Sequence, residues 1–225
     1  MTSEPTTAPG RREDERADDE RDDDVGRINA LTDGVIAIAI TLLALDLKPD
    51  LPTSTSSHRL LDYLHHHLGP YIAFVIAFFV IAQYWVLHRR IMSRVRRSSP
   101  AMLRVTLVFL FAVTFAPVTA FLNGDLGNDL AVTLFAANVL VMGGCMGALA
   151  EIVHRQRLDG GVEGREQRVR RRARSVGSLV IPALVAGLAW VIGPHAGYLY
   201  LLFLPLSRTQ DLVWWLVSRR TPAAP

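Results

Sequence analysis

The segment from Arg27 to Lys48, RINALTDGVIAIAITLLALDLK, carries two kinds of chemistry on one predicted helix. At about 100° per residue, four of its residues share a face at the i, i+3, i+4, i+7 spacing: Ile38, Thr41, Leu42 and Leu45. This apolar stripe with a single hydroxyl suits contact with lipid or with another helix. Asp33 falls on the other side, and a carboxylate just inside a membrane is costly unless it is paired. We expect its partner to be Arg27 or His88.

The distribution of apolar and charged residues indicates a membrane protein. Half of the 225 residues are apolar, and they are gathered in long runs that are almost free of charge, with dense charge between them. This pattern is typical of a multi-span membrane protein. The net charge of +3 divides into −6 for residues 2–24 and +9 for the rest. Because the positive charge flanks the apolar runs, it predicts membrane orientation rather than nucleic-acid binding.

The sequence predicts an all-α integral membrane protein with six transmembrane helices. The expected spans are residues 28–47, 71–87, 102–122, 130–150, 176–192 and 197–206. Arginine-rich segments follow the second, fourth and sixth spans, whereas the links after the other three contain only Lys48 and Arg59 as basic residues. The positive-inside rule therefore predicts that the N- and C-termini are both cytoplasmic.

Three regions are expected along the chain. Residues 1–26 are predicted to form a disordered acidic cytoplasmic tail. A regulatory or partner-binding role of this tail is a further hypothesis. Residues 27–208 form the six-span domain. Residues 209–225 form an interfacial helix and a C-terminal tail, with Trp214 and Trp215 at the depth of the lipid headgroups.

Nothing in the sequence predicts an enzyme, a cofactor or a metal site. The spans hold no convergent set of nucleophile, acid and base. Cys145 is the single cysteine, which excludes a disulfide or a cysteine-based metal site within one chain. Adjacent histidines point in different directions on a helix, so the triplet from His65 to His67 favours a solvated extracellular turn over a metal site or a pH sensor.

Two stretches resemble the transmembrane protein 175 family of bacterial and lysosomal potassium channels. RINALTDGVIAIAITLLALDL resembles its first-helix motif, in which Arg and three residues precede Phe-Ser-Asp and an AIAITLL-like run. YWVLHRR, from Tyr84 to Arg90, resembles its aromatic-Trp-x-x-His-His segment, and the six-span layout and chain length also agree. The sequence departs from the family pattern where Leu31 replaces Phe, Thr32 replaces Ser and Arg89 replaces the second His. Replacement of the Phe ring by Leu31 is expected to alter gating or assembly.

The resemblance implies a homotetramer of six-span subunits, with a pore lined by helix 1 of each subunit. It assigns an apolar constriction, or gate, to Ile38, Leu42 and Leu45, and a selectivity hydroxyl to Thr41. It also implies a cytoplasmic packing network made by six residues: Arg27, Leu31, Thr32, Asp33, Trp85 and His88. Asp46 lies near the expected outer mouth, where it attracts cations or simply ends the helix in solvent.

The expected function is that of a potassium-permeable cation channel in a bacterial plasma membrane. Its expected partners are K+, the lipid bilayer and further copies of the chain. A ring of large apolar side chains closes a pore by dewetting it. Since no TVGYG-like filter occurs, potassium preference is expected from pore radius and the Thr41 hydroxyls. A secondary transporter and a non-conducting scaffold are the alternatives; the lack of an inverted repeat and of charge at the span centres favours the channel.

Overall fold

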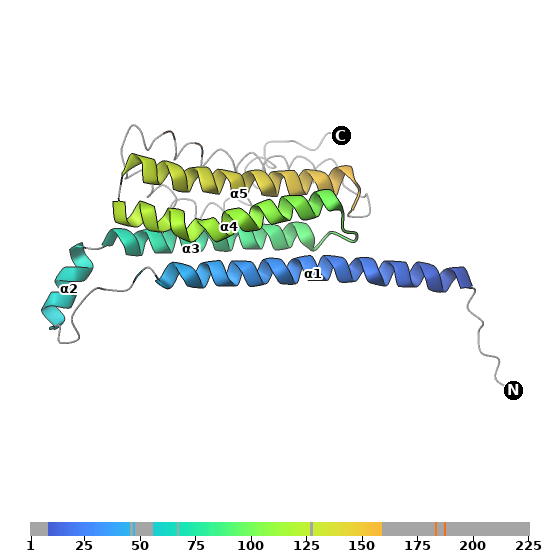
Figure 1. Cartoon of the computed structure of the whole chain (residues 1–225), viewed down its shortest axis with the longest axis horizontal. Helices are drawn as coiled ribbons and strands as arrows, with labels where there is room; N and C mark the ends of the chain where they lie inside the picture. The colour runs from blue at the N-terminus through green and yellow to red at the C-terminus, as the bar shows by residue number, and fades with distance from the viewer. Residues whose placement is uncertain are drawn as a thin grey trace, which may run out of the picture.

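The computed structural model describes residues 9–45, 47, 56–66, 68–126, 128–158, 183 and 187. Five helices follow one another in this part of the chain (Figure 1): α1 (Pro9–Leu45), α2 (Ser57–His66), α3 (Leu68–Met92), α4 (Pro100–Leu126) and α5 (Asp129–Arg155). The described residues contain no strand. The all-α prediction is therefore confirmed for them.

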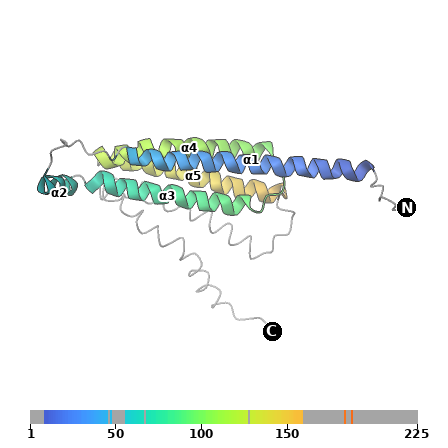
Figure 2. The same ribbon diagram turned by 90° about the horizontal axis from the view of Figure 1, so that it is seen from below.

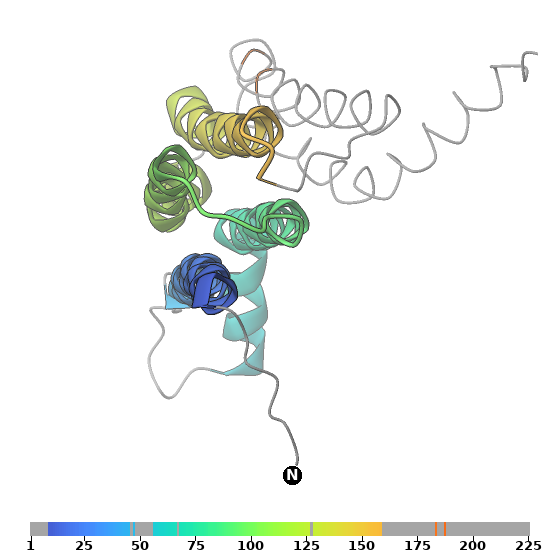
Figure 3. The same ribbon diagram turned by 90° about the vertical axis from the view of Figure 1, so that its right-hand side faces the viewer.

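Four of the helices lie side by side as a bundle, and α2 lies at one end of it (Figures 1 and 2). Helix α4 contacts the other three, while α1 packs against α3 and α4. Seen along the bundle, α1 occupies the side opposite α5 (Figure 3). Helix α1 is therefore joined to the bundle through part of its circumference only.

The bundle helices are long and apolar enough to cross a membrane. Their candidate spans are Asp24–Leu45, Leu68–Met92, Pro100–Asn123 and Asp129–Arg155, by length and composition. These four helices occur where the first four spans were predicted. The predicted spans at 176–192 and 197–206, and the predicted interfacial helix and tail at 209–225, lie outside the described residues.

Helix α1 begins well before its apolar part. It starts at Pro9, so a helical backbone replaces the disorder predicted for residues 9–26, while residues 1–8 lie outside the described part. The physical reason is that helix nucleation is costly but propagation is not. Once the apolar segment is helical, a preceding run without an internal proline extends the helix one residue at a time.

Helix α2 was not predicted. His65 and His66 belong to it, which corrects the expected turn at this triplet; His67 lies outside the described residues. The segment Ser57–His66 contains neither glycine nor proline, and the amide of Leu60 donates to the carbonyl oxygen of Ser56 at 3.1 Å. Its brevity and mixed polarity hide such a helix from a search for long apolar runs.

The core is densest along the seam between α4 and α5. Large side chains from both helices are fully buried there: Phe109, Val113, Val132, Phe135, Met142 and Met146. Alanines on both helices, including Ala112 and Ala136, allow the backbones to approach closely. The buried Asn138 Nδ2 donates to the carbonyl oxygen of Ala112 at 3.0 Å and so fixes the register of the seam.

Removing this interhelical bond is expected to destabilise the protein moderately. Asn138→Ala should cost about 1 kcal/mol, since polar bonds between membrane helices contribute about that much. The melting temperature in detergent should fall by about 2–4 °C, measured by the fluorescence of the unfolding protein. Thr114→Ala is the control, because the Thr114 hydroxyl is exposed and bonds to Phe111 of its own helix. Equal shifts in both variants would contradict the role of Asn138.

Candidate functional site

One face of α1 packs into the bundle and the opposite face does not. The buried residues of α1 recur at helical spacing: Val25, Ile28, Thr32, Ile36, Ala39 and Leu43. The predicted stripe has the opposite property, and its apolar members expose 60, 43 and 56 % of their surface: Ile38, Leu42 and Leu45. Thr41 is exposed beside them. Among the residues that the structure describes, the stripe therefore forms an apolar face of α1 that no other helix covers.

Thr41 presents an oxygen to this face. Its Oγ1 donates to the carbonyl oxygen of Ile38 at 2.8 Å, so the hydroxyl proton is used within the helix. A hydroxyl oxygen keeps two acceptor lone pairs when its proton is donated. The exposed Thr41 therefore offers an acceptor, the type of group that replaces water around a cation.

Asp33 is held by α3. The Trp85 indole Nε1 donates to Asp33 Oδ1 at 2.7 Å, a short bond to a charged acceptor. The guanidinium carbon of Arg89 lies 5.2 Å from the centroid of the Trp85 ring, which is cation–π geometry. The hydrogen-bond partner of Asp33 is thus Trp85 rather than Arg27 or His88. Together these contacts connect the charged part of α1 to the end of α3.

Thr32 and His88 lie inside the bundle. Thr32 is completely buried, and its Oγ1 donates to the carbonyl oxygen of Ile28 at 2.9 Å, so its hydroxyl is satisfied within α1. The buried His88 ring stacks on Phe109 of α4, with centroids 5.7 Å apart and planes 6° from parallel. His88 Nε2 has no hydrogen-bond partner among the described residues. His88 therefore connects α3 to α4 chiefly by ring packing.

The structure brings only some of the predicted network together. Asp33 and Trp85 bond directly, whereas Arg27 and Leu31 are exposed on α1. Arg27 makes no hydrogen bond or ion pair to any residue that the structure describes. Asp46, the predicted outer-mouth residue, lies outside the described part of the chain.

Sequence reasoning did not find two contacts of this region. Phe109 lies in a different helix from His88, and nothing in the local sequence of either residue points to the other. Arg89 was noted only as a departure from a motif, although its spacing of four residues from Trp85 places both side chains on one helix face. That spacing is the signal that was available. Within the described ranges, no group of three or more His, Cys, Asp or Glu is placed to hold a metal ion.

The helices and the polar links between them define an α-helical, multi-pass membrane protein. Comparisons with known proteins agree with this class. A family model of the endosomal/lysosomal potassium channel TMEM175 matches residues 27–117, a range that contains both motifs noted in the sequence. The fold is similar to the crystal structure of a lysosomal potassium-selective channel TMEM175 homolog from Chamaesiphon minutus, with a TM-score of 0.69 and 25% identity, over 82% of this chain and 98% of that one.

Two curated relatives are potassium channels by name. A potassium channel of Streptomyces collinus is 32% identical over 176 residues, which cover 75% of this chain and 84% of that protein. A potassium channel of Chamaesiphon minutus is 39% identical over 94 residues, which cover 42% and 46%. The chain therefore belongs to the TMEM175 potassium-channel family, as its two motifs predicted. Its relatives are named as channels and not as enzymes, which fits the expectation of a non-enzyme.

Proposed function

We propose that this chain forms a potassium-permeable cation channel in a bacterial plasma membrane, with both termini in the cytoplasm. Four copies of a six-span subunit surround the pore, and α1 of each copy lines it. Membership of a potassium-channel family supports the permeant ion. The observation that carries the proposal is the face of α1 that bears Ile38, Leu42 and Leu45, which no described helix of the same chain covers.

The proposed gate is the ring of these three side chains from each copy. A hydrated cation meets only hydrocarbon there, so a narrow ring excludes water and blocks passage, and a small rotation or tilt of α1 opens it. The Asp33–Trp85 bond at 2.7 Å supports this mechanism, because it anchors α1 to α3 away from the stripe. Ion flow is passive, along the electrochemical gradient.

The Thr41 hydroxyl is proposed to favour potassium. Its proton is donated to Ile38, so the oxygen can face an ion. Thr41→Val keeps the shape and removes this oxygen. We expect the preference for K+ over Na+ to fall severalfold, while total cation flux persists. Purified protein in liposomes, with K+ and Na+ fluxes measured on the same preparation, provides the test.

The control for this substitution is Thr114→Val, because Thr114 has the same exposed hydroxyl geometry on α4, where it bonds to Phe111 at 2.8 Å. It should leave the ion preference unchanged. If wild-type protein passes neither ion across a range of voltage and pH, the channel proposal fails. If it conducts and Thr41→Val keeps the full preference, only the role of the hydroxyl fails.

A further inference from the structure

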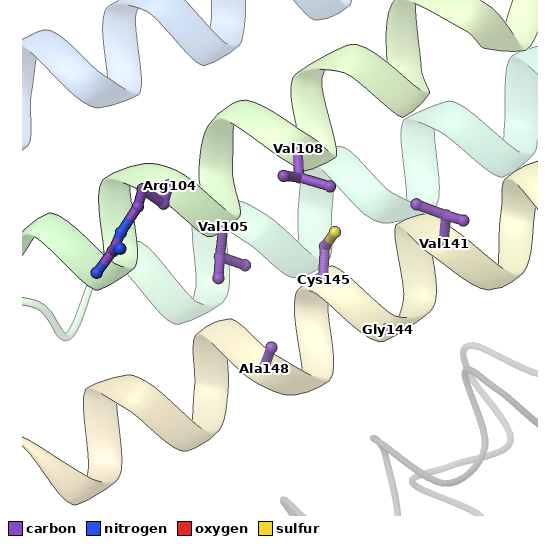
Figure 4. A pocket seen from close by; sticks show the side chains of 7 residues that line it. All are labelled: Arg104, Val105, Val108, Val141, Gly144, Cys145 and Ala148. Carbon is purple, nitrogen blue, oxygen red and sulfur yellow. The ribbon is translucent and has the colours of Figure 1, made fainter.

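A groove on the outside of the seam between α4 and α5 is not used by the proposed pore. It has a volume of about 310 Å³ and opens to the surface of the bundle. Seven residues line it: Arg104, Val105, Val108, Val141, Gly144, Cys145 and Ala148. Figure 4 shows Arg104 at one end of this set of residues and Val141 at the other, with Gly144, Cys145 and Ala148 on α5.

Apart from Arg104, the lining carries no charged side chain. Gly144 and Ala148 lack bulk, so α5 is hollowed opposite the valines of α4. Both helices are candidate membrane spans, so the groove lies at hydrocarbon depth for most of its length. A flexible hydrocarbon chain suits such a groove, because it can adapt to the surface between two packed helices.

Arg104 gives the groove a charged end. It lies one turn into α4, at the end of the bundle that also carries Arg94, Arg96 and Arg97 of the basic α3–α4 link. Its Nε donates to the carbonyl oxygen of Pro100 at 3.3 Å, which leaves the two terminal nitrogens of the guanidinium without a partner in the described part of the chain. Paired N–H donors of this kind match the oxygens of a phosphate group.

We propose that this groove binds an anionic phospholipid of the cytoplasmic leaflet, with one acyl chain between α4 and α5 and the phosphate at Arg104. The charge of the headgroup complements the basic end of the bundle, and the apolar lining complements the chain. This site is separate from the α1 stripe, so the proposal holds whether or not the protein conducts ions.

Native mass spectrometry of the full-length protein in detergent tests the proposal. Phosphatidylglycerol and phosphatidylcholine with identical acyl chains are added separately, and the fraction of protein that retains lipid is measured. Wild type should prefer phosphatidylglycerol. Arg104→Gln should weaken phosphatidylglycerol binding by about fivefold, the effect of one arginine at an anionic lipid surface. Arg97→Gln is the matched control, since Arg97 is exposed in the same basic region but does not line the groove.

A second variant tests the apolar part. A Cβ added at Gly144 meets no atom within 4 Å, so a side chain can begin there without a backbone clash, and Gly144→Leu is designed to fill the groove. It should reduce binding of both lipids. Ala137→Leu adds bulk to an exposed position one turn beyond Val141 and should have little effect. Arg104→Lys keeps the positive charge and should keep most of the preference for phosphatidylglycerol. It therefore shows whether the effect of Arg104→Gln comes from the lost charge or from a disturbed fold.

Three results would overturn the proposal. The first is equal binding of both lipids by the wild-type protein. The second is that Arg97→Gln weakens binding as much as Arg104→Gln, which would indicate attraction by general surface charge rather than by the groove. Alternatively, Gly144→Leu would shift the oligomer mass while leaving lipid retention intact. That last result would assign the groove to contact between copies of the chain.

Discussion

Leu42→Asn is expected to raise potassium flux through the reconstituted protein by about tenfold, with less preference for K+ over Na+. Leu42 is 43 % exposed on the face of α1 that no described helix covers. In a narrow ring, replacing hydrocarbon by a carboxamide lets water remain and gives the ion a polar neighbour. A barrier lowered by about 1.4 kcal/mol accounts for the tenfold change. Ion flux into liposomes under a potassium gradient measures it.

The matched control is Leu107→Asn. Leu107 lies on α4 and is 49 % exposed, so it has the same chemistry and similar exposure but is not part of the stripe. It should leave flux unchanged, whereas Ile38→Asn should act like Leu42→Asn. A non-conducting scaffold would give no flux in any variant, and a transporter would show coupled uptake that Leu42→Asn alters only slightly. Equal increases in the two leucine variants would indicate a general leak and contradict the gate.

The arrangement of α1 shows which properties follow from sequence alone. Helical periodicity separated the stripe at Ile38 and Leu42 from Asp33, and the structure places the stripe on the exposed face. Periodicity alone did not identify the partner of Asp33, although the family resemblance placed Trp85 in the same network. Trp85 lies 52 residues further along the chain, and its bond to Asp33 depends on the axial register and rotation of α1 against α3. Those quantities are set by tertiary packing, which no local pattern encodes.

The fold shows the same division. Four apolar runs predicted four long helices, because hydrocarbon thickness alone sets the length of such a run. The helical backbone of residues 9–26 and the short helix α2 were not predicted, because the polar composition of both segments is typical of a disordered tail and of a turn. Residues 9–26 are helical as the continuation of the apolar part of α1. Helix α2 adjoins another helix, because a single residue separates it from α3.

Trp85→Phe is expected to lower the melting temperature in detergent by about 3–6 °C. The substitution keeps an aromatic ring beside Arg89 but removes the indole N–H that donates to Asp33 Oδ1 at 2.7 Å. A hydrogen bond to a charged group contributes about 1.5 kcal/mol at the lower end of its range, which suits Asp33 because it is exposed in the single chain. About 2–4 °C accompanies each kcal/mol in a protein of this size.

A double-mutant cycle separates this bond from the other roles of the two residues. Asp33→Ala removes the acceptor, and its effect should add little to that of Trp85→Phe, since each change abolishes the same contact. Asp33→Asn keeps an acceptor oxygen without the charge, so its melting temperature should lie between those of wild type and Asp33→Ala. Strict additivity of the two substitutions would show that the contact contributes nothing. If the bond also fixes the rotation of α1, Trp85→Phe will change ion flux as well, because the stripe and Asp33 share one rigid helix.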